Sequence, residues 1–451
     1  MAWYSRGKLQ LSDTQYEEPK KGLFYYLIVI AYILLVAFAF LVSTERKAII
    51  PLFPTIFRHA CDVGVIALSV LYFLVTAIKS RIHVALDLAW LWSIPYIGIA
   101  MISLLIWILN QTDLNYIIRG LNSVGSAELT ALAVACAIWT FGQKVVDYTF
   151  YGAVIAVVLV VVQVILDYGF AEFGQQYMTL LITFTGKTGP AMKYMEFHDL
   201  AQGLGIFLMY YTWTLKKNLR NVLLFAASFV CFSLSLKRIV VIALIAGLLI
   251  GWFINKLLFR KRWYFLIAFE VVLFLGAYAY LFLIKQGYYG TVMNWLGINT
   301  MSRDAIYNYY SGFFEISPDY LGRGLRFIYT HTSETTDVIE VSKNVVLAVH
   351  NAHNEYITYF IELGFFGFIF WLLSNSWIKL NGIRRRYGWE AMTFTMMVVA
   401  YCFITYLTDN TYFYYSINYV GFVTSGAAVI SSRKAAVYEQ NIGIRWLHRD
   451  E

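Results

Sequence analysis

The feature that most constrains the fold is a succession of long apolar runs. Most are close to twenty residues long, which is about the length that an α-helix needs to cross the hydrocarbon core of a bilayer. Helices suit lipid because lipid offers no partner to free backbone N–H and C=O groups. The runs also lack the alternation of membrane β-strands. We therefore predict an all-α polytopic membrane protein with twelve transmembrane helices, at 23–43, 61–78, 86–108, 124–141, 148–166, 198–215, 219–235, 239–255, 263–284, 355–378, 389–409 and 414–432.

Composition excludes a soluble globular protein. Hydrophobic residues make up 60% of the 451 residues and charged residues only 14%. Soluble domains usually contain about 45–50% apolar and about 25% charged residues. A soluble globule of this length has too little interior to bury so many apolar side chains. We expect the lipid bilayer to solvate much of the surface.

The charges predict an orientation in the membrane. Basic residues outnumber acidic ones by 35 to 27. If the N-terminus is cytoplasmic, 22 of the 35 fall in cytoplasmic segments, among them Lys379 and 384–386 after the tenth run. Cytoplasmic loops of membrane proteins are enriched in lysine and arginine. We therefore expect a multi-pass protein of the cytoplasmic (inner) membrane with both termini in the cytoplasm. This topology accounts for the basic surplus without nucleic acid as a partner.

The predicted spans divide the chain into five parts. Residues 1–22 form a cytoplasmic tail, 23–284 contain helices one to nine, and 285–354 form a large extracytoplasmic loop. Helices ten to twelve occupy 355–432, and 433–451 form a second cytoplasmic tail. A connection as long as 285–354 is usually functional. The four cysteines lie in or beside apolar runs, in no pattern typical of disulfides or metal sites.

The densest polar cluster lies where the large loop re-enters the membrane. It contains His350, His353, Asn354 and Glu355, with Glu362 about two and a half helical turns beyond His353. A histidine at this edge can act as a general base, because its reference pKa is about 6.5. A carboxylate at the depth of Glu362 needs a cavity or a partner. Alternatively, these residues cap the helix and pair structurally, or the two histidines chelate a metal, although no third ligand is apparent.

A second cluster is basic and falls on the extracytoplasmic side. It consists of Lys237, Arg238, Arg303, Arg323 and Arg326, which come from three separate segments. Basic residues placed there run against the general charge trend. A lipid diphosphate would explain them, because guanidinium groups bind phosphate oxygens in bidentate fashion. The alternative is pairing with acidic residues of the loop or with ordinary lipid head groups.

Several short motifs point to one family. His353–Tyr356 followed by Glu362–Gly367 resembles a His-Asn-x-aromatic and Glu-x-Gly-x-x-Gly signature, and Leu321–Gly324 resembles a Gly-x-Gly that follows a loop arginine, here Arg303. Ser235–Arg238 is similar to a Ser-x-Ser-Arg turn, with Lys237 where serine is commoner. The order, the spacing and the twelve-span layout resemble the O-antigen ligase and polymerase family of membrane glycosyltransferases. In the sixth span, His198 resembles the family's histidine, although Asp199 departs from its usual proline or asparagine.

The resemblance implies a GT-C-like fold and a metal-independent, inverting glycosyl transfer without a cofactor, on the extracytoplasmic face. The donor would be a glycan on undecaprenyl diphosphate, and the acceptor a second lipid-linked oligosaccharide. His353 would deprotonate the acceptor hydroxyl, while Arg238 and Arg303 would bind the diphosphate. A flippase and a chain-length regulator are the implied protein partners.

Two other functions stay open from the sequence. A ligase would move the finished glycan to a lipid or protein acceptor, and the motifs do not separate it from a polymerase. We favour the polymerase of O-antigen, capsule or exopolysaccharide, because aromatic residues, at 18% of the chain, suit stacking on sugars. A flippase or transporter of lipid-linked glycan belongs to another class. Transporters often contain inverted repeats with interrupted helices, and we find no such pairing here.

Overall fold

The described part of the chain consists of helices, one short hairpin and their connections. A computed structural model describes residues 22–44, 57–76, 81–183, 198–216, 218–235, 237–257, 261–297, 300, 302–335, 338–342, 345–348 and 351–432. Within these residues, seven helical stretches are long and apolar enough to cross a membrane by length and composition. The structure thus supports the predicted helical membrane protein.

Each expected apolar run falls on a helix. These helices are α1 (Leu23–Ser43), α2 (Phe57–Thr76), α3 (Ile82–Leu109), α4 (Leu114–Phe141), α5 (Val145–Tyr168), α8 (His198–Trp213), α9 (Leu219–Ser235), α10 (Arg238–Lys256), α11 (Arg262–Lys285), α15 (Glu355–Leu373), α17 (Trp389–Thr405) and α18 (Tyr415–Ile430). Four of them, α8, α9, α17 and α18, have only 16 or 17 residues. The number of membrane crossings therefore stays a prediction.

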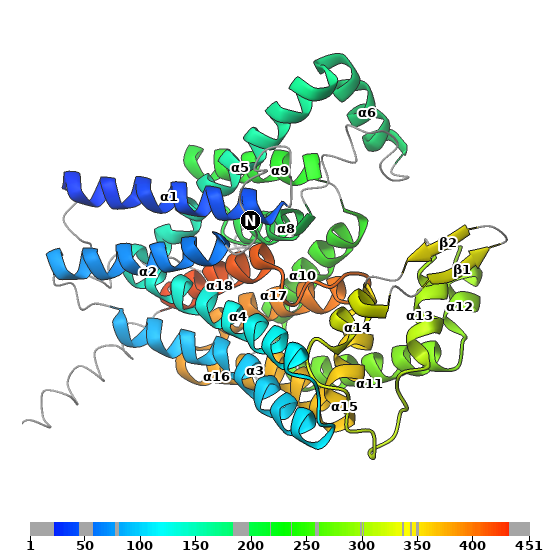
Figure 1. Cartoon of the computed structure of the whole chain (residues 1–451). Helices are drawn as coiled ribbons and strands as arrows, with labels where there is room; N and C mark the ends of the chain where they lie inside the picture. Colours follow the sequence, from blue (N-terminus) through cyan, green and yellow to red (C-terminus); the bar gives the residue numbers. More distant parts are fainter. Residues whose placement is uncertain are drawn as a thin grey trace, which may run out of the picture.

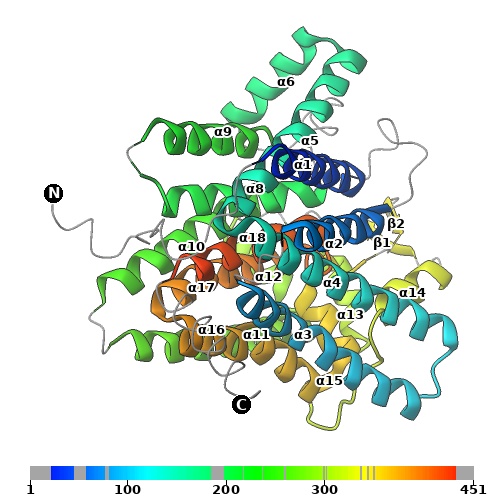
Figure 2. The same cartoon turned by 90° about the vertical axis from the view of Figure 1, so that its left-hand side faces the viewer.

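Helix α18 is the centre of the packing. It lies among α4, α5, α8 and α17 (Figures 1 and 2), and nearly all its residues are buried. The Phe422 ring stacks on Trp92 of α3 at 4.8 Å between ring centroids. Helix α11 lies at the periphery, where Val272 and Leu275 are 70% and 63% exposed. Large apolar side chains exposed to this extent are expected on a surface that faces lipid.

The large loop folds into short elements. These are α12 (Tyr289–Trp295), α13 (Arg303–Ser311), α14 (Phe327–Thr335), β1 (Val338–Ser342) and β2 (Val345–Ala348). The two strands pair antiparallel, with Ile339 opposite Leu347. Figure 1 shows these elements together at one end of the long helices, which we call the loop end. Helix α6 (Phe170–Thr183) extends away from the bundle beyond α5 (Figure 1).

The tenth expected span is longer than predicted. Helix α15 continues through a π-helical turn, η4 (Ser374–Ile378), into α16 (Lys379–Tyr387), so that the helical stretch runs from Glu355 to Tyr387. The apolar run predicts that the span ends at residue 378 and that Lys379 begins a cytoplasmic segment. The helix continues beyond residue 378, and Lys379 lines a cavity in the bundle.

Helix α15 is interrupted where the large loop passes it. Gly364 has φ 69° and ψ −172°, which breaks the helical hydrogen-bond ladder. The groups freed by the break bind the loop, because the Phe365 N–H donates to the Tyr320 carbonyl at 2.8 Å and the Gly324 N–H donates to the Glu362 carbonyl at 2.7 Å. Buried backbone groups must be paired in this way. The loop therefore supplies the partners that the broken helix lacks.

The glycines of both motifs are needed for this contact. A Cβ atom on Gly322, whose φ is 96°, would lie 2.5 Å from the Gly364 nitrogen. A Cβ atom on Gly364 would lie 2.2 Å from the carbonyl carbon of Leu321. Only glycine accepts both the positive φ and the close backbone approach. Two motifs that the sequence presents separately are thus the two halves of one contact.

Candidate functional site

The site is built around His353, which directly precedes α15. Its φ is 48°, an uncommon value for a residue other than glycine. The neighbouring Asn354 caps α15, because its Oδ1 accepts the Ile357 N–H at 3.0 Å. The Asn354 side chain also donates to the Tyr280 hydroxyl at 2.8 Å, and its backbone N–H donates to the Asn410 side chain at 3.0 Å. Asn354 is therefore a structural residue that fixes the backbone carrying His353.

Four segments meet at His353. The Lys237 ammonium forms an ion pair with Asp409 at 2.9 Å, and both side chains are only 14% exposed. Asp409, Lys237 and Arg303 all lie close enough to His353 to act on its pKa. The fold thus brings the ends of α9 and α17, the start of α13 and the start of α15 together at the loop end.

The environment keeps His353 neutral. Its side chain is accessible at the surface, yet the surrounding protein atoms desolvate it and lower its pKa. The negative charge of Asp409 acts to raise the pKa of His353, whereas the positive charges of Arg303 and Lys237 lower it further. Because the resulting pKa is below the usual value for histidine, the imidazole is unprotonated at pH 7 and can accept a proton.

Asp409 remains ionised although it lies deep in the cluster. Burial acts to raise the pKa of its carboxyl group. The charge of Lys237 and its hydrogen bond to the carboxylate, together with the hydrogen bond from the Asn410 N–H, outweigh burial, so that the pKa is lowered. A fixed carboxylate beside a neutral imidazole stabilises the imidazolium that forms when the imidazole takes a proton.

Asp409 is a site residue that the sequence does not predict. The eleventh apolar run, 389–409, places it at the end of a membrane span, whereas α17 ends at Thr405. The surrounding tyrosine and leucine residues give this segment the hydropathy of a membrane-spanning helix. The signal available was the polar triplet Thr408, Asp409 and Asn410, which is out of place in a transmembrane helix.

Tyrosines support the other side of His353. The Tyr307 hydroxyl donates to the His353 carbonyl oxygen at 3.4 Å, and the Tyr307 ring packs against Tyr289 at 4.9 Å between centroids. Burial raises the pKa of Tyr307 to about 12, so that its hydroxyl keeps its proton at neutral pH. Arg303, at the first position of α13, acts electrostatically on both tyrosines.

The remaining predicted cations differ in their surroundings. Arg238 is exposed at the first position of α10, next to Lys237. Arg323 is exposed, with its guanidinium 5.7 Å from the Phe327 ring centroid. Arg326 is held more firmly, because its Nε donates to Ser123 Oγ at 2.7 Å. The Arg326 guanidinium also lies 4.9 Å from the ring centroid of Phe413. The described contacts thus assign Arg326 to joining α4 with the segment before α18.

Both predicted carboxylates have structural partners. Glu355 is 4% exposed and accepts the Tyr412 N–H at 2.7 Å. Glu362 is 2% exposed and accepts the Ile328 N–H at 3.2 Å, at the start of α14. A carboxylate at a helix N-terminus satisfies free N–H groups and interacts favourably with the helix dipole. These contacts match the structural alternative considered for the two residues.

Two predicted histidines have no described side chain. His350 lies outside the described residues, and His198 starts α8 with its side chain outside the description. Chelation of a metal by His350 and His353 therefore falls outside the described part of the chain. Within that part, no three His, Cys, Asp or Glu residues are grouped to hold a metal.

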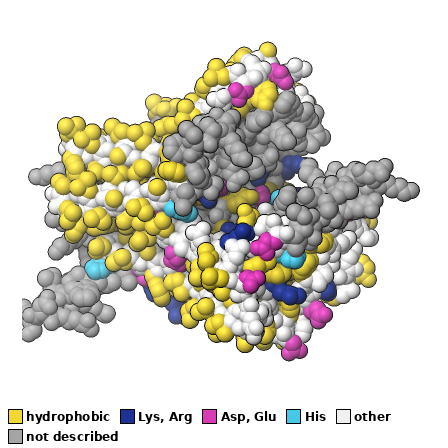
Figure 3. Space-filling model, viewed as in Figure 1, with side chains coloured by type: hydrophobic (Ala, Val, Ile, Leu, Met, Phe, Trp, Pro, Cys, Tyr) yellow, Lys and Arg dark blue, Asp and Glu magenta, His cyan; other side chains and the backbone are white. Residues whose placement is uncertain are grey.

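The surface at the loop end differs from the rest of the molecule. Figure 3 shows Lys, Arg, Asp and Glu side chains gathered with histidine on one part of the visible face, whereas the part over α1 and α2 is mostly hydrophobic.

No protein-family model matches the chain, and no curated protein matches it. The function must therefore be inferred from the site itself, where His353 is a proton acceptor beside the positive charges of Lys237 and Arg303.

Proposed function

We propose that the chain is a polysaccharide polymerase. It would transfer a growing glycan from undecaprenyl diphosphate to an incoming lipid-linked repeat unit. The observation that carries this proposal is the neutral His353 imidazole beside the Lys237–Asp409 pair and Arg303. A base next to fixed cations suits a reaction in which a hydroxyl loses a proton while a diphosphate leaves. The family resemblance of the motifs supports the same reaction.

The reaction would be a single displacement at the anomeric carbon. The acceptor hydroxyl gives its proton to His353 as its oxygen bonds to the anomeric carbon. The bond from that carbon to the diphosphate oxygen breaks, and its electron pair leaves with undecaprenyl diphosphate. Attack opposite the leaving group inverts the anomeric configuration. A diphosphate is weakly basic, so that charge neutralisation by Arg303 replaces an acid catalyst and a metal.

Asp409 would assist His353 without touching the sugar. Its carboxylate stabilises the imidazolium formed during transfer, in the manner of the acid in a catalytic triad. Lys237 keeps Asp409 ionised and in place through their 2.9 Å ion pair. In this scheme Arg238 and Arg323, both exposed, would meet the diphosphate as it enters.

The proposal includes the cellular setting. The chain would cross the cytoplasmic membrane twelve times, with both termini in the cytoplasm and the loop end outside. The sugars of a lipid-linked unit would then reach His353 from the extracytoplasmic side, with their diphosphate at the membrane surface. A flippase would deliver the units, and a chain-length regulator would set the number that are joined.

Purified protein in detergent, given short lipid-linked repeat units, tests this function. We expect a ladder of longer lipid-linked glycans, and we expect the His353→Ala variant to form none. His83→Ala serves as the matched control, because His83 lies in the first turn of α3, outside the proposed site. Full ladders from the His353→Ala protein would refute the role of the base. Transfer only to a separate lipid or protein acceptor would identify a ligase instead.

A further inference from the structure

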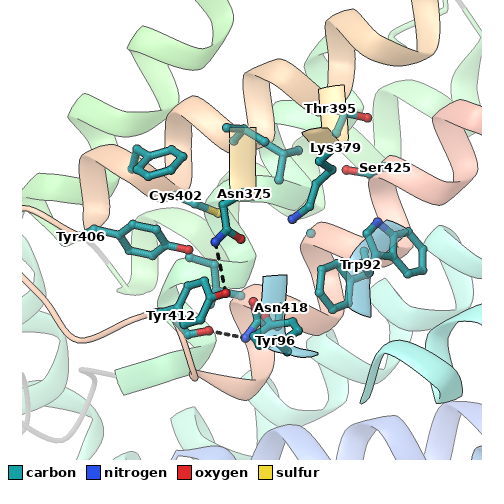
Figure 4. A pocket seen from close by; sticks show the side chains of 16 residues that line it. Trp92, Tyr96, Asn375, Lys379, Thr395, Cys402, Tyr406, Tyr412, Asn418 and Ser425 are labelled. Carbon is teal, nitrogen blue, oxygen red and sulfur yellow. Dashed lines mark hydrogen bonds between the residues drawn. The ribbon is translucent and has the colours of Figure 1, made fainter. Parts of the chain in front are cut away.

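A second polar site lies inside the bundle, below the loop end. It is a cavity of about 40 Å³ between α3, α16, α17 and α18. That space holds a few waters but no sugar or diphosphate. Figure 4 shows its walls, which include Trp92, Tyr96, Asn375, Lys379, Tyr412 and Ser425.

A lysine points into this cavity. Lys379 follows directly on η4, and its amine is directed toward the space in Figure 4. π-Helical turns such as η4 frequently occur at functional sites. Among the described residues, Lys379 forms no ion pair with a carboxylate and no hydrogen bond, and no acidic residue lines the cavity. Its Nζ lies 5.9 Å from the centroid of the Phe422 ring.

The other polar groups around the cavity are of two kinds. The side-chain amides of Asn375 and Asn418 are already used, because they donate to the Tyr412 hydroxyl at 3.1 Å and to the Tyr412 carbonyl at 2.6 Å. The hydroxyls of Tyr96 and Ser425 have no hydrogen-bond partner within the described structure. Two hydroxyl groups and one ammonium thus line a small space in which no described carboxylate balances the positive charge.

We propose that this cavity binds a monatomic inorganic anion of the halide class. An unpaired ammonium inside a helical bundle is costly, and a counter-anion removes most of that cost. The size of the space admits a chloride or bromide ion with a water molecule. Lys379 supplies the charge, and Tyr96 and Ser425 supply hydrogen bonds.

The site would stabilise the neighbouring loop. Tyr412 forms part of the cavity wall, and its backbone N–H is the group that binds Glu355. The same loop carries Asp409 at its start. An occupied cavity would therefore hold the 409–414 segment in place, a stabilisation that does not depend on the proposed polymerase activity.

Thermal unfolding in matched salts tests the site. The purified protein would be unfolded in sodium chloride, sodium bromide and sodium gluconate at equal ionic strength. We expect the Tm to rise with chloride or bromide and to saturate, with no such rise in gluconate. We expect Lys379→Met to abolish the halide-dependent rise, and Lys256→Met, an exposed lysine of α10, to keep it.

A second variant and a direct observation complete the test. Ser425→Ala should require a several-fold higher halide concentration for the same rise, which covers the case that Lys379→Met does not fold. Crystals grown in bromide should give an anomalous peak beside Lys379. Equal Tm values in all three salts, an unchanged halide response in Lys379→Met or Ser425→Ala, or water alone in the cavity would overturn the proposal.

Discussion

At the scale of single residues, the site depends on a histidine held in an uncommon backbone conformation. Asn354 fixes the backbone of His353 from one side, and Tyr307 binds its carbonyl oxygen from the other. Asp409 and Lys237 form the ion pair that faces it. The catalytic hypothesis therefore rests on the proton affinity of one imidazole and on the charges that set it.

The pH dependence of activity follows from the lowered pKa of His353. The base acts only when neutral, so activity should fall as the pH drops through that pKa, which lies below the usual value of about 6.5. Asp409→Asn removes the charge that raises this pKa, and should move the acid limb of the pH–rate profile to still lower pH. It should also reduce kcat by about 10²-fold or more, because the imidazolium loses its partner. An unshifted limb would show that Asp409 does not act on His353.

The role of Arg303 can be tested with a substitution that keeps its positive charge but removes the planar guanidinium group. We expect Arg303→Lys to reduce kcat/KM for the lipid-linked donor at least tenfold, since lysine cannot form the bidentate contact with a diphosphate. Arg119→Lys is the control, because Arg119 binds Ser333 on α14 at 3.0 Å, away from the proposed diphosphate. Wild-type kinetics in Arg303→Lys would count against diphosphate binding by this residue.

At the scale of elements, the interrupted helix α15 and the loop around Gly322 pack together as one unit. The loop crosses the helix where Gly364 leaves the helical conformation, and each supplies hydrogen bonds to the other. This contact fixes the large loop, with α14 behind it, against the helix that begins next to His353. The two motifs thus provide the support on which the loop end is built.

Gly364→Ala should disrupt the contact between α15 and the loop around Gly322. The added Cβ would collide with the backbone at Leu321 and would force an alanine into positive φ, so we expect a loss of at least about 2 kcal/mol in the free energy of unfolding. Gly125→Ala, with nothing within 4 Å of the added atom, should be neutral or slightly stabilising. Thermal or denaturant unfolding in detergent compares the two. Equal stabilities would mean that the loop does not depend on this contact.

The elements also show what a sequence can reveal. Apolar runs predicted the positions of the long helices well, because membrane-length helices are defined by local composition. The contact between Gly322 and Gly364 was hidden, since spacing does not say which segments meet in space. Asp409 was overlooked for a related reason, because aromatic neighbours gave its segment the hydropathy of a span. The continuation of the tenth helix past residue 378 was not predicted, because a π-helical turn inside a long helix leaves no signal in an apolar run.

At the scale of the whole molecule, the chain combines an apolar helical body with a polar loop end. The body explains the composition, with α18 in its centre and lipid-facing residues on helices such as α11. The loop end collects short helices, a hairpin and the proposed site (Figure 1). This division predicts where water reaches the chain.

Single-cysteine labelling in cells tests the predicted topology, in a background without native cysteines. Asn308 on α13 is exposed in the large loop, and we expect Asn308→Cys to react with a membrane-impermeant maleimide added outside. Arg385→Cys, exposed on α16, should react only after the membrane is opened. Labelling with the opposite pattern would invert the proposed orientation and place His353 in the cytoplasm.

The central claim is that His353 drives glycosyl transfer from a lipid diphosphate. The most direct test measures the release of undecaprenyl diphosphate together with the glycosidic bonds formed by purified protein in the presence of EDTA. We predict one undecaprenyl diphosphate per new bond, with inverted anomeric configuration and neither product from His353→Ala. Movement of intact lipid-linked units across a vesicle membrane, without release of the diphosphate, would contradict the claim and identify a transporter.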